Sequence, residues 1–557
     1  MKRFKSNILT AGVVITALSL GSCSESFLDV SSKTESTTGN FYKTEGDAWR
    51  ALIGCYDGWR QISSNPGSAN IYLQATVMSD ECYGSTGNGD GRGFQMLDQF
   101  DQSQSPSDLQ YFSTNWKVYY AGVYRCNEML THTYVWSNPA NEGLYMGEAH
   151  ALRALLYFDM VRMWGNIPLF TAPSEDNRAQ ADPAEVYALI VDDLKYAIAN
   201  IPANANLGTD NFGRITKYAA EALLARVYLY YTGYYGKELG FTNEAGETTG
   251  TCTKAEALAA VEDVISSGNY SLVSNFKNLW PAASLDPIPG ELGWASSSTY
   301  AGDANSEVIL AQNFTPTQDY NGNNDSNRWL VMMGMRNLND TEKGYGKGWG
   351  ACNITPAFLD KYLAGDPRYT ASVIDLEAEG CDKIDGWQTS VNDWREYTGY
   401  TVKKYTPMVF GNGLPATNAT GTAGFQECNA QPWVIVRYAD VLLMAAELGS
   451  AQAANHLNAV RSRAGLPALA LTQQNIMDER ARELAFEGIR YWDLLRQGVE
   501  TLADAVAATG GDVLNGGVPG TVTYNKEKII RTKGLNQIPE DQITLSNGVL
   551  KQNEGWY

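Results

Sequence analysis

The chain has 557 residues, of which 44% are hydrophobic and 19% are charged, a balance typical of a globular protein and not of a disordered one. Its formal net charge of −20 opposes contact with phosphate backbones and anionic lipid heads, so nucleic acid is not an expected partner. The eight cysteines are scattered and form no CxxC pair, which argues against a disulfide framework but leaves one or two bridges open.

The first 22 residues have the features of an export signal. Lys2, Arg3 and Lys5 form a positively charged start, and an apolar run over residues 8–20 follows. This run is shorter than the roughly 20 residues that span a bilayer, so we expect it to be removed. The small residues before Cys23 resemble the lipobox of bacterial lipoproteins, in which the cysteine is lipidated and becomes the mature N-terminus. An ordinary secretory signal with a coincidental cysteine is the alternative.

Apolar residues recur at intervals of three and four in two parts of the chain, which predicts amphipathic helices there. In the first part we expect helices over residues 44–61, 112–130, 144–164, 183–200, 216–231 and 254–266. In the second part we expect them over residues 356–363, 437–463 and 472–497. Pairs of small residues, such as Ala219 with Ala220 and Ala445 with Ala446, favour close packing in helix–turn–helix units.

The composition changes over residues 269–431, and in the same way over a short insert at residues 79–101. Asn, Gly, Ser, Asp and Thr dominate both stretches, and tryptophan and tyrosine are interspersed without a helical period. Long loops in a compact protein are usually functional or disordered, and the high aromatic content argues against disorder. We therefore predict a loop-rich surface carried on a helical scaffold.

Short segments along the mature chain occur in a specific order. They lie at residues 23–29, 147–154, 164–169, 216–230, 366–368, 436–447, 458–465, 479–496, 538–539 and 552–557. One segment alone would be weakly specific, but the ordered set covers nearly the whole mature chain. In this order the segments resemble those of the SusD/RagB family, the surface glycan-binding lipoproteins of the Bacteroides group.

The resemblance implies a mostly α-helical fold, in which tetratricopeptide-like helix pairs carry a loop-rich ligand-binding region with few short strands. It implies a lipoprotein signal peptide over residues 1–22 and a single SusD-like domain over residues 23–557. Within this domain we expect the scaffold at about 41–268 and 432–500. We expect the ligand-binding region at about 269–431, with the loop 79–101 beside it.

The resemblance also implies a function in polysaccharide utilisation and nutrient uptake. Members of the family capture oligosaccharides or polysaccharides at the outer membrane, where lipid anchors them, and deliver the ligand to a SusC-like TonB-dependent transporter. They generally do not hydrolyse the ligand, so we expect no enzyme, no cofactor and no metal site. Only Glu25 and Asp29 are acidic just after the cysteine, where surface lipoproteins of this group often carry an acidic cluster, so display on the cell surface rests on the family alone.

Carbohydrate recognition needs aromatic faces for the C–H faces of pyranose rings, and planar polar groups for the hydroxyls. Two loop patches combine these groups and supply the candidate glycan-binding residues. The first patch contains Asp80, Tyr83, Arg92 and Phe94. The second contains Trp294, Tyr320, Asn323, Trp329, Tyr345 and Trp349. For each aromatic residue, packing in the core is the alternative.

Catalytic and metal-binding motifs do not stand out in the sequence. The three histidines have no metal-ligand spacing, and neither a Walker A nor a GxSxG motif occurs. Charged residues over 472–497, among them Glu483, Glu487 and Arg490, are spaced three or four apart, so we predict structural ion pairs and not paired catalytic carboxylates. Capture of peptides is the first alternative to glycan binding, and lipid-anchored glycoside hydrolysis is the weaker one.

Overall fold

The computed structural model describes residues 41–64, 70–106, 109–284, 299–315, 325–409, 425–426 and 429–556. The expected lipidation site Cys23 and the candidate residues Trp294, Tyr320 and Asn323 lie outside these ranges. Within them, no helix combines the length and the apolar character needed to cross a membrane.

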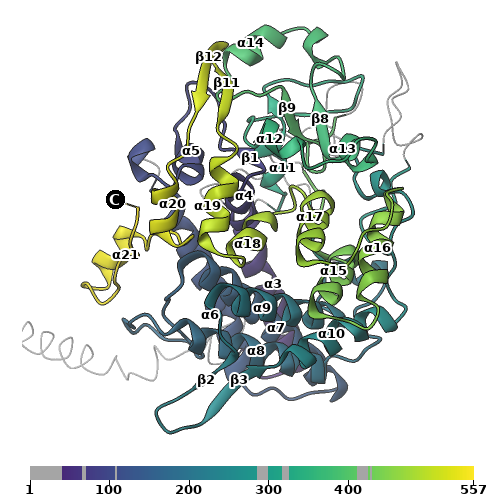
Figure 1. Cartoon of the computed structure of the whole chain (residues 1–557). Coiled ribbons are helices and arrows are strands. Elements are labelled where there is room, and N and C mark those ends of the chain that lie inside the picture. The colour runs from purple at the N-terminus through teal and green to yellow at the C-terminus, as the bar shows by residue number, and fades with distance from the viewer. Residues whose placement is uncertain are drawn as a thin grey trace, which may run out of the picture.

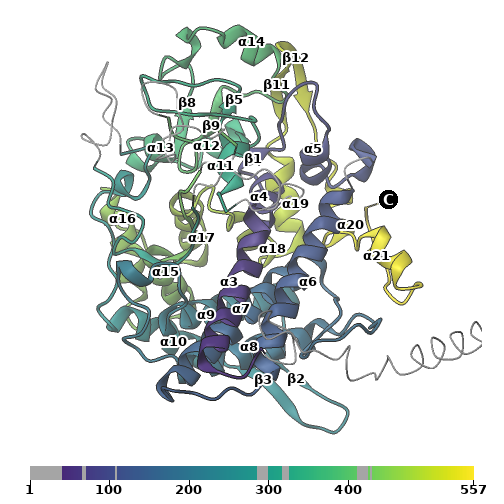
Figure 2. The same cartoon turned by 180° about the vertical axis from the view of Figure 1, so that it is seen from behind.

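Helices dominate the first part of the chain, as the apolar periodicity predicted. They are α3 (Glu45–Ser64), α4 (Ile71–Val77), α5 (Gly93–Asp98), α6 (Gln110–Thr131), α7 (Ala140–Trp164), α8 (Pro183–Asn200), α9 (Lys217–Tyr235) and α10 (Lys254–Ser266). Long helices that follow one another pack together: α6 on α7, α7 on α8, α8 on α9 and α9 on α10. These helices form the lower half of the molecule in Figure 1, and the view from behind shows α3 beside α6 (Figure 2).

Shorter helices follow in the second part. They are α11 (Arg328–Met333), α12 (Pro356–Leu359), α13 (Pro367–Ser372), α14 (Trp387–Asn392), α15 (Tyr438–Leu448), α16 (Ala453–Arg463), α17 (Gln473–Glu483), α18 (Arg490–Leu495), α19 (Val499–Ala507), α20 (Lys526–Thr532) and α21 (Glu540–Leu545). Helix α15 packs on α10 and so returns the chain to the scaffold. Helices α11 to α14 belong to the loop-rich region, in the upper half of Figure 1.

The strands are few and short, which confirms the predicted fold class. One antiparallel sheet has the order β1 (Cys82–Tyr83), β7 (Asn353–Ile354), β9 (Tyr400–Val402), β8 (Val373–Asp375). The two-stranded sheets pair β10 (Trp433–Arg437) with β4 (Val308–Gln312), β11 (Gly511–Asn515) with β12 (Val518–Val522), β2 (Leu239–Thr242) with β3 (Thr248–Cys252), and β5 (Met335–Arg336) with β6 (Lys347–Gly348). Strand β1 comes from the early insert and its partners from residues 353–402, so the first sheet joins the two predicted ligand-binding segments.

Capping residues fix the helix boundaries that the sequence predicted best. The Asp182 side chain accepts a hydrogen bond from the backbone N–H of Ala184, and Pro183 occupies the first turn of α8. Thr253 and Glu256 form a reciprocal capping box at the start of α10. Both helices have the predicted bounds.

The prediction of one continuous helix over each of residues 437–463 and 472–497 is wrong. Gly449, with φ of 83°, ends α15, and the later stretch is interrupted between α17 and α18. At that interruption Phe486 and Gly488 have φ of 62° and 72°, a region that favours glycine. A Cβ on Gly488 would lie 2.6 Å from the Cβ of Tyr72, so no residue larger than glycine fits at position 488. The apolar stripe of the sequence does not reveal this turn.

Beside the interruption, a network of buried ion pairs holds the scaffold to the loop-rich region. Glu487 accepts hydrogen bonds from Arg437 and Lys404, each at 2.8 Å, and Glu483 accepts from Arg437 at 2.6 Å and from Arg368 at 3.0 Å. All five side chains are at most 1% exposed. The predicted structural role of these carboxylates is confirmed. The main partners of these carboxylates, however, are residues of other structural elements, whereas the sequence predicted partners three or four positions away on the same helix.

Candidate functional site

The structure divides the candidate residues by exposure. The side chains buried to 6% exposure or less are Asp80, Tyr83, Phe94, Trp329 and Tyr345. Arg92 is exposed and Trp349 is half-buried. The expectation that the buried set is available to a ligand is wrong, because each of its members is committed to a partner inside the protein.

The polar members of the buried set are already hydrogen-bonded. Both carboxylate oxygens of Asp80 accept from the Arg490 guanidinium, at 2.8 and 2.9 Å. The Tyr83 hydroxyl donates to the backbone carbonyl of Thr509. The Tyr345 hydroxyl donates to a carboxylate oxygen of Glu379 at 2.6 Å. Such pairs satisfy groups that burial would otherwise penalise, so they hold the loops in place.

The buried aromatic rings pack on other rings. Phe94 stacks on Tyr111, with ring centroids 5.6 Å apart. Trp329 contacts both Tyr72 and Trp433, with centroids 5.4 and 4.2 Å away. No face of Trp329 is left for a sugar, since only 2% of the residue is exposed.

Arg336 joins the exposed loop 88–92 to Trp349. Its guanidinium donates to Asp90 at 2.9 Å, to Asp393 at 2.8 Å and to the backbone carbonyl of Trp349 at 3.3 Å. Asp90 and Arg336 are 246 positions apart in the chain, so the predicted loop 79–101 and a residue of the second predicted patch, Trp349, meet at this arginine.

We call the resulting face the Arg336 surface. It comprises Asn88, Asp90, Arg92, Arg336, Asn337, Lys347, Trp349, Asp393 and Phe425. It lies near α14 and the tips of β11 and β12, at the top of Figure 1: the Asn88 N–H donates to the carbonyl of Asp393, and the Gly516 N–H donates to that of Trp394.

Close packing fixes the position of Arg336. A Cβ added to Gly87 would lie 1.9 Å from an Arg336 guanidinium nitrogen, so a larger residue there would displace this guanidinium. On the other side, Gly350 has φ of 73°, and a Cβ on it would lie 2.5 Å from the indole nitrogen of Trp394. A second arginine, Arg395, donates to the backbone carbonyls of residues 88 and 90, at 2.8 and 3.2 Å, and supports the loop from below. The loop is therefore ordered before any ligand arrives, which reduces the entropy cost of binding.

Each of the two aromatic rings of the Arg336 surface lies close to a cation, one of which, Arg328, is buried. The Arg328 guanidinium lies 5.3 Å from the centroid of the Trp349 ring, and the Lys347 ammonium lies 4.5 Å from that of Phe425. Asn337 and the loop 88–92 add an exposed amide, a carboxylate and a guanidinium. This combination can stack on a pyranose ring and hydrogen-bond its hydroxyls. Among the described residues, no cluster of three His, Cys, Asp or Glu side chains is arranged to hold a metal ion.

Two buried carboxyl groups, Asp98 and Glu396, lie beneath this surface. Asp98 accepts from the Gly84 N–H at 2.8 Å, and Glu396 accepts from the Gln95 amide at 3.3 Å. Burial, together with the neighbouring Glu396, raises the pKa of Asp98 well above its usual range. Burial raises the pKa of Glu396 to about 7, against the lowering effects of Gln95 and Arg92. Both carboxyl groups therefore favour the neutral form inside the fold.

We expect Glu396→Gln to remove part of the pH dependence of stability. Because the folded pKa of Glu396 is raised from 4.5 to about 7, its neutral form stabilises the fold fully below pH 4.5, and this contribution is lost as pH rises through 7. The variant should gain about 3 kcal/mol over the wild type in free energy of unfolding between pH 4.5 and pH 8. Urea titrations of both proteins at several pH values measure this difference in the free energy of unfolding. A constant difference across that range would contradict the assignment.

Sequence reasoning missed Arg336, Asp393 and Arg395, which organise the surface. Each stands in polar sequence without a period, and nothing near them in the chain marks them as partners of residues 88–92. Only their long-range contacts reveal this role.

Comparison with known proteins adds independent information. A model described as the SusD family matches residues 306–556, and a second, described as starch-binding associating with outer membrane, matches residues 67–229. Together the two matches span most of the scaffold and of the loop-rich region.

Individual relatives agree with these matches. A SusD-like protein of Formosa agariphila is 25% identical over 533 aligned positions, with 89% of this chain and 92% of that protein covered. The starch-binding protein SusD of Bacteroides thetaiotaomicron is 24% identical, with 73% and 72% covered. Among solved structures, a laminarin-binding SusD-like protein matches with a TM-score of 0.69 at 27% identity, over 92% of this chain and 99% of its own. A surface glycan-binding protein A from Bacteroides thetaiotaomicron, solved with laminarihexaose, shares the fold at 22% identity and a TM-score of 0.69, over 92% of this chain and 100% of its own.

Proposed function

Because the chain belongs to the SusD family, we propose that it captures an oligosaccharide or polysaccharide on the Arg336 surface. The observation that carries the proposal is the meeting of the exposed loop 88–92 with Trp349 around one fixed guanidinium. That meeting brings the carboxylate, amide and guanidinium groups of the surface to the backbone of Trp349, whose partly exposed indole supplies the aromatic face in this proposal. The relatives named for binding starch or laminarin support the same class of ligand.

Binding without hydrolysis is part of the proposal. A glycosidase needs one carboxylic acid and one carboxylate on either side of the scissile bond. On the Arg336 surface, Asp90 and Asp393 are both paired with the same guanidinium. The two acids beneath this surface whose pKa is raised, Asp98 and Glu396, are at most 3% exposed and cannot reach a polymer. Release of reducing sugar by the purified protein would contradict this part of the proposal.

Delivery and anchoring complete the proposal. We infer lipidation of Cys23, attachment to the outer membrane on the cell surface, and transfer of the glycan to a SusC-like TonB-dependent transporter. The support is the sequence of the first 23 residues and the family, one of whose models is described as associating with outer membrane. Mass spectrometry of the mature N-terminal peptide tests the lipid, and co-purification with a β-barrel transporter tests the partner. An unmodified N-terminal peptide, or purification without a barrel, would contradict the respective part.

We expect Trp349→Ala to weaken oligosaccharide binding about tenfold, since a ring stacked on a sugar contributes on the order of 1–2 kcal/mol. Its indole is only half-buried, so the free energy of unfolding should fall by no more than about 1–2 kcal/mol. Calorimetric titration with short oligosaccharides measures the affinity, and a polymer would partly mask the loss through avidity.

Trp49→Ala is the matched control for this experiment. Trp49 is 38% exposed on α3 in the scaffold, so its loss should leave glycan affinity unchanged. Equal loss of affinity in both variants, or none in Trp349→Ala, would move the site away from the Arg336 surface. Binding of a peptide mixture in place of glycans would favour the peptide-capturing alternative.

A further inference from the structure

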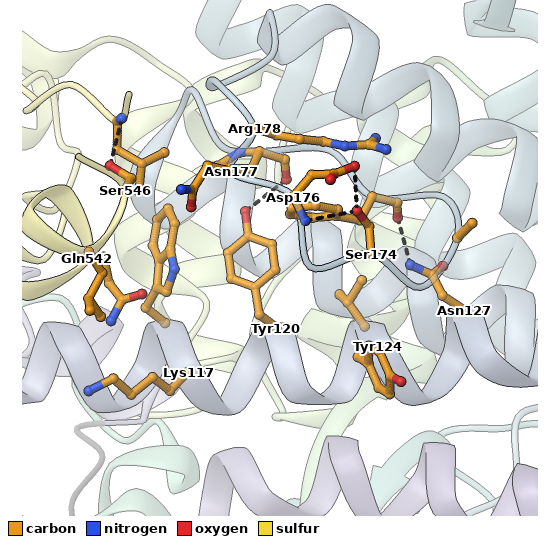
Figure 3. A pocket seen from close by; sticks show the side chains of 17 residues that line it. Lys117, Tyr120, Tyr124, Asn127, Ser174, Asp176, Asn177, Arg178, Gln542 and Ser546 are labelled. Carbon is orange, nitrogen blue, oxygen red and sulfur yellow. Dashed lines mark hydrogen bonds between the residues drawn. The ribbon is translucent and has the colours of Figure 1, made fainter. Parts of the chain in front are cut away.

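A separate cavity of about 410 Å³ opens on the helical scaffold (Figure 3). One wall is the face of α6 that carries Tyr120 and Tyr124. The loop between α7 and α8 forms the second wall, and α21 with the residues after it forms the third. In Figures 1 and 2, α6 and α21 both lie well below α14, so this cavity is distinct from the Arg336 surface.

Hydrogen bonds tie the loop wall to the scaffold. The Tyr120 hydroxyl donates to the carbonyl of Pro168 at 2.8 Å, and the Asn127 amide donates to that of Phe170 at 2.9 Å. The Tyr157 hydroxyl donates to the carbonyl of Phe170 at 2.9 Å and accepts from its N–H at 2.8 Å. A cavity with walls fixed in this way loses little conformational entropy when it is filled.

The open side of the cavity has an aromatic face. Tyr124 is 50% exposed, and it stands one helical turn beyond Tyr120 on the same face of α6. Interaction with the Glu128 carboxylate, four positions further along α6, raises the pKa of the Tyr124 hydroxyl. Opposite, the Arg178 guanidinium lies 5.0 Å from the centroid of the Phe170 ring, which places a planar cation at the rim.

Three exposed polar side chains of the loop, those of residues 176–178, line the same cavity. The Asn177 amide has no hydrogen-bond partner among the described residues, and Figure 3 shows this residue at the cavity. Asp176 accepts from Ser174 with one carboxylate oxygen, at 2.9 Å. Arg178 donates to the carbonyl of Leu169 through one nitrogen, at 3.0 Å. An amide, a carboxylate oxygen and guanidinium nitrogens are therefore available to sugar hydroxyls.

We propose that this cavity is a second saccharide-binding site, which takes one or two sugar rings stacked on Tyr124 and hydrogen-bonded by Asp176, Asn177 and Arg178. The inference rests on the proposed function, because it assigns a second contact to the same class of ligand. Two separated sites on one protein would hold a long glycan more tightly than either site alone. The volume falls in the range of small-ligand sites.

Isothermal titration of the mature protein tests the second site. The probes are hexasaccharides of glucan, mannan, galactan and xylan type, with laminarihexaose among them. With the hexasaccharide that the wild type binds, we expect two sites per protein molecule in the wild type. The affinity of one site should fall about tenfold in Tyr124→Ala or Asn177→Ala, and that of the other site about tenfold in Trp349→Ala. Tyr124→Phe keeps the ring and should keep both sites. The polymer should bind Tyr124→Ala at least about tenfold more weakly than the wild type.

The outcomes separate the two proposals. A single site in the wild type that Tyr124→Ala leaves unchanged would overturn the second site and leave the Arg336 surface standing. Binding that Tyr124→Ala abolishes and Trp349→Ala does not change would support the cavity and overturn the Arg336 surface. Failure of every hexasaccharide to bind the wild type, or binding of peptides alone, would overturn both. Circular dichroism melts should match the wild type for Tyr124→Ala, because this side chain is half exposed.

Discussion

Replacing Glu487 with Gln is expected to lower the free energy of unfolding by about 3–5 kcal/mol and to leave glycan affinity unchanged. The Glu487 carboxylate accepts hydrogen bonds from Arg437 at 2.8 and 2.9 Å and from Lys404 at 2.8 Å, with only 1% of the side chain exposed. Loss of the negative charge leaves two buried cations short of a partner. Burial already lowers the pKa of Lys404 to about 8, and Glu487 is the group that opposes this most, so Lys404 should lose its proton near neutral pH in the variant.

Chemical denaturation of the two proteins measures this effect. Asp504→Asn is a suitable control, because it breaks an ion pair with Lys526 in which both side chains are more than half exposed. Such surface pairs contribute about 0–1 kcal/mol, so the control should unfold nearly as the wild type does. If Glu487→Gln lost ligand binding and kept its stability, the carboxylate would belong to the binding site and not to the core.

Trp329→Ala should destabilise the fold by about 3–5 kcal/mol, the usual cost of removing a large buried aromatic side chain. The Trp329 ring contacts Tyr72 and Trp433 and is 2% exposed, so its removal leaves a cavity between α4, α11 and β10. Trp349→Ala is the informative partner, because the half-buried Trp349 should lose affinity with little loss of stability. Denaturation midpoints and oligosaccharide affinities of both variants separate packing from recognition. A stable Trp329→Ala protein that no longer binds would contradict the assignment of this ring to the core.

The sequence alone does not distinguish the environments of these two tryptophans. Trp349 stands in a glycine-rich stretch, and Trp329 follows the polar residues 323–328 and begins an apolar run over residues 329–333; from sequence both are candidate ligand contacts. What separates them is the approach of Tyr72 and Trp433, which are distant in the chain, to one of them only. Solvent exposure is thus decided by long-range packing, which a single sequence does not contain.

The helical scaffold was more predictable because its signals are local. Apolar periodicity and capping residues act within a few positions, and they placed α8 and α10 correctly. The interruption between α17 and α18 was missed because it depends on the approach of Tyr72 to Gly488 from another part of the chain. The Arg336 surface was predicted only through the exposed Arg92 and the half-buried Trp349, while the arginines that organise it became visible through their contacts.

The pairing of Asp80 with Arg490 has a consequence for the order of folding. It joins positions 410 residues apart, and β1 likewise pairs with β7, which lies more than 250 residues later. Closing such long loops costs more entropy than forming local helix pairs, so contacts of this kind form late and slowly. In a chain synthesised from its N-terminus, α6 to α10 can assemble early. The ligand-binding face can form only after nearly the last tenth of the polypeptide, which includes Arg490 and the residues after it, has been made. Until then the early insert, with its aromatic side chains, has no partner strand and is open to misassociation and proteolysis while the chain folds.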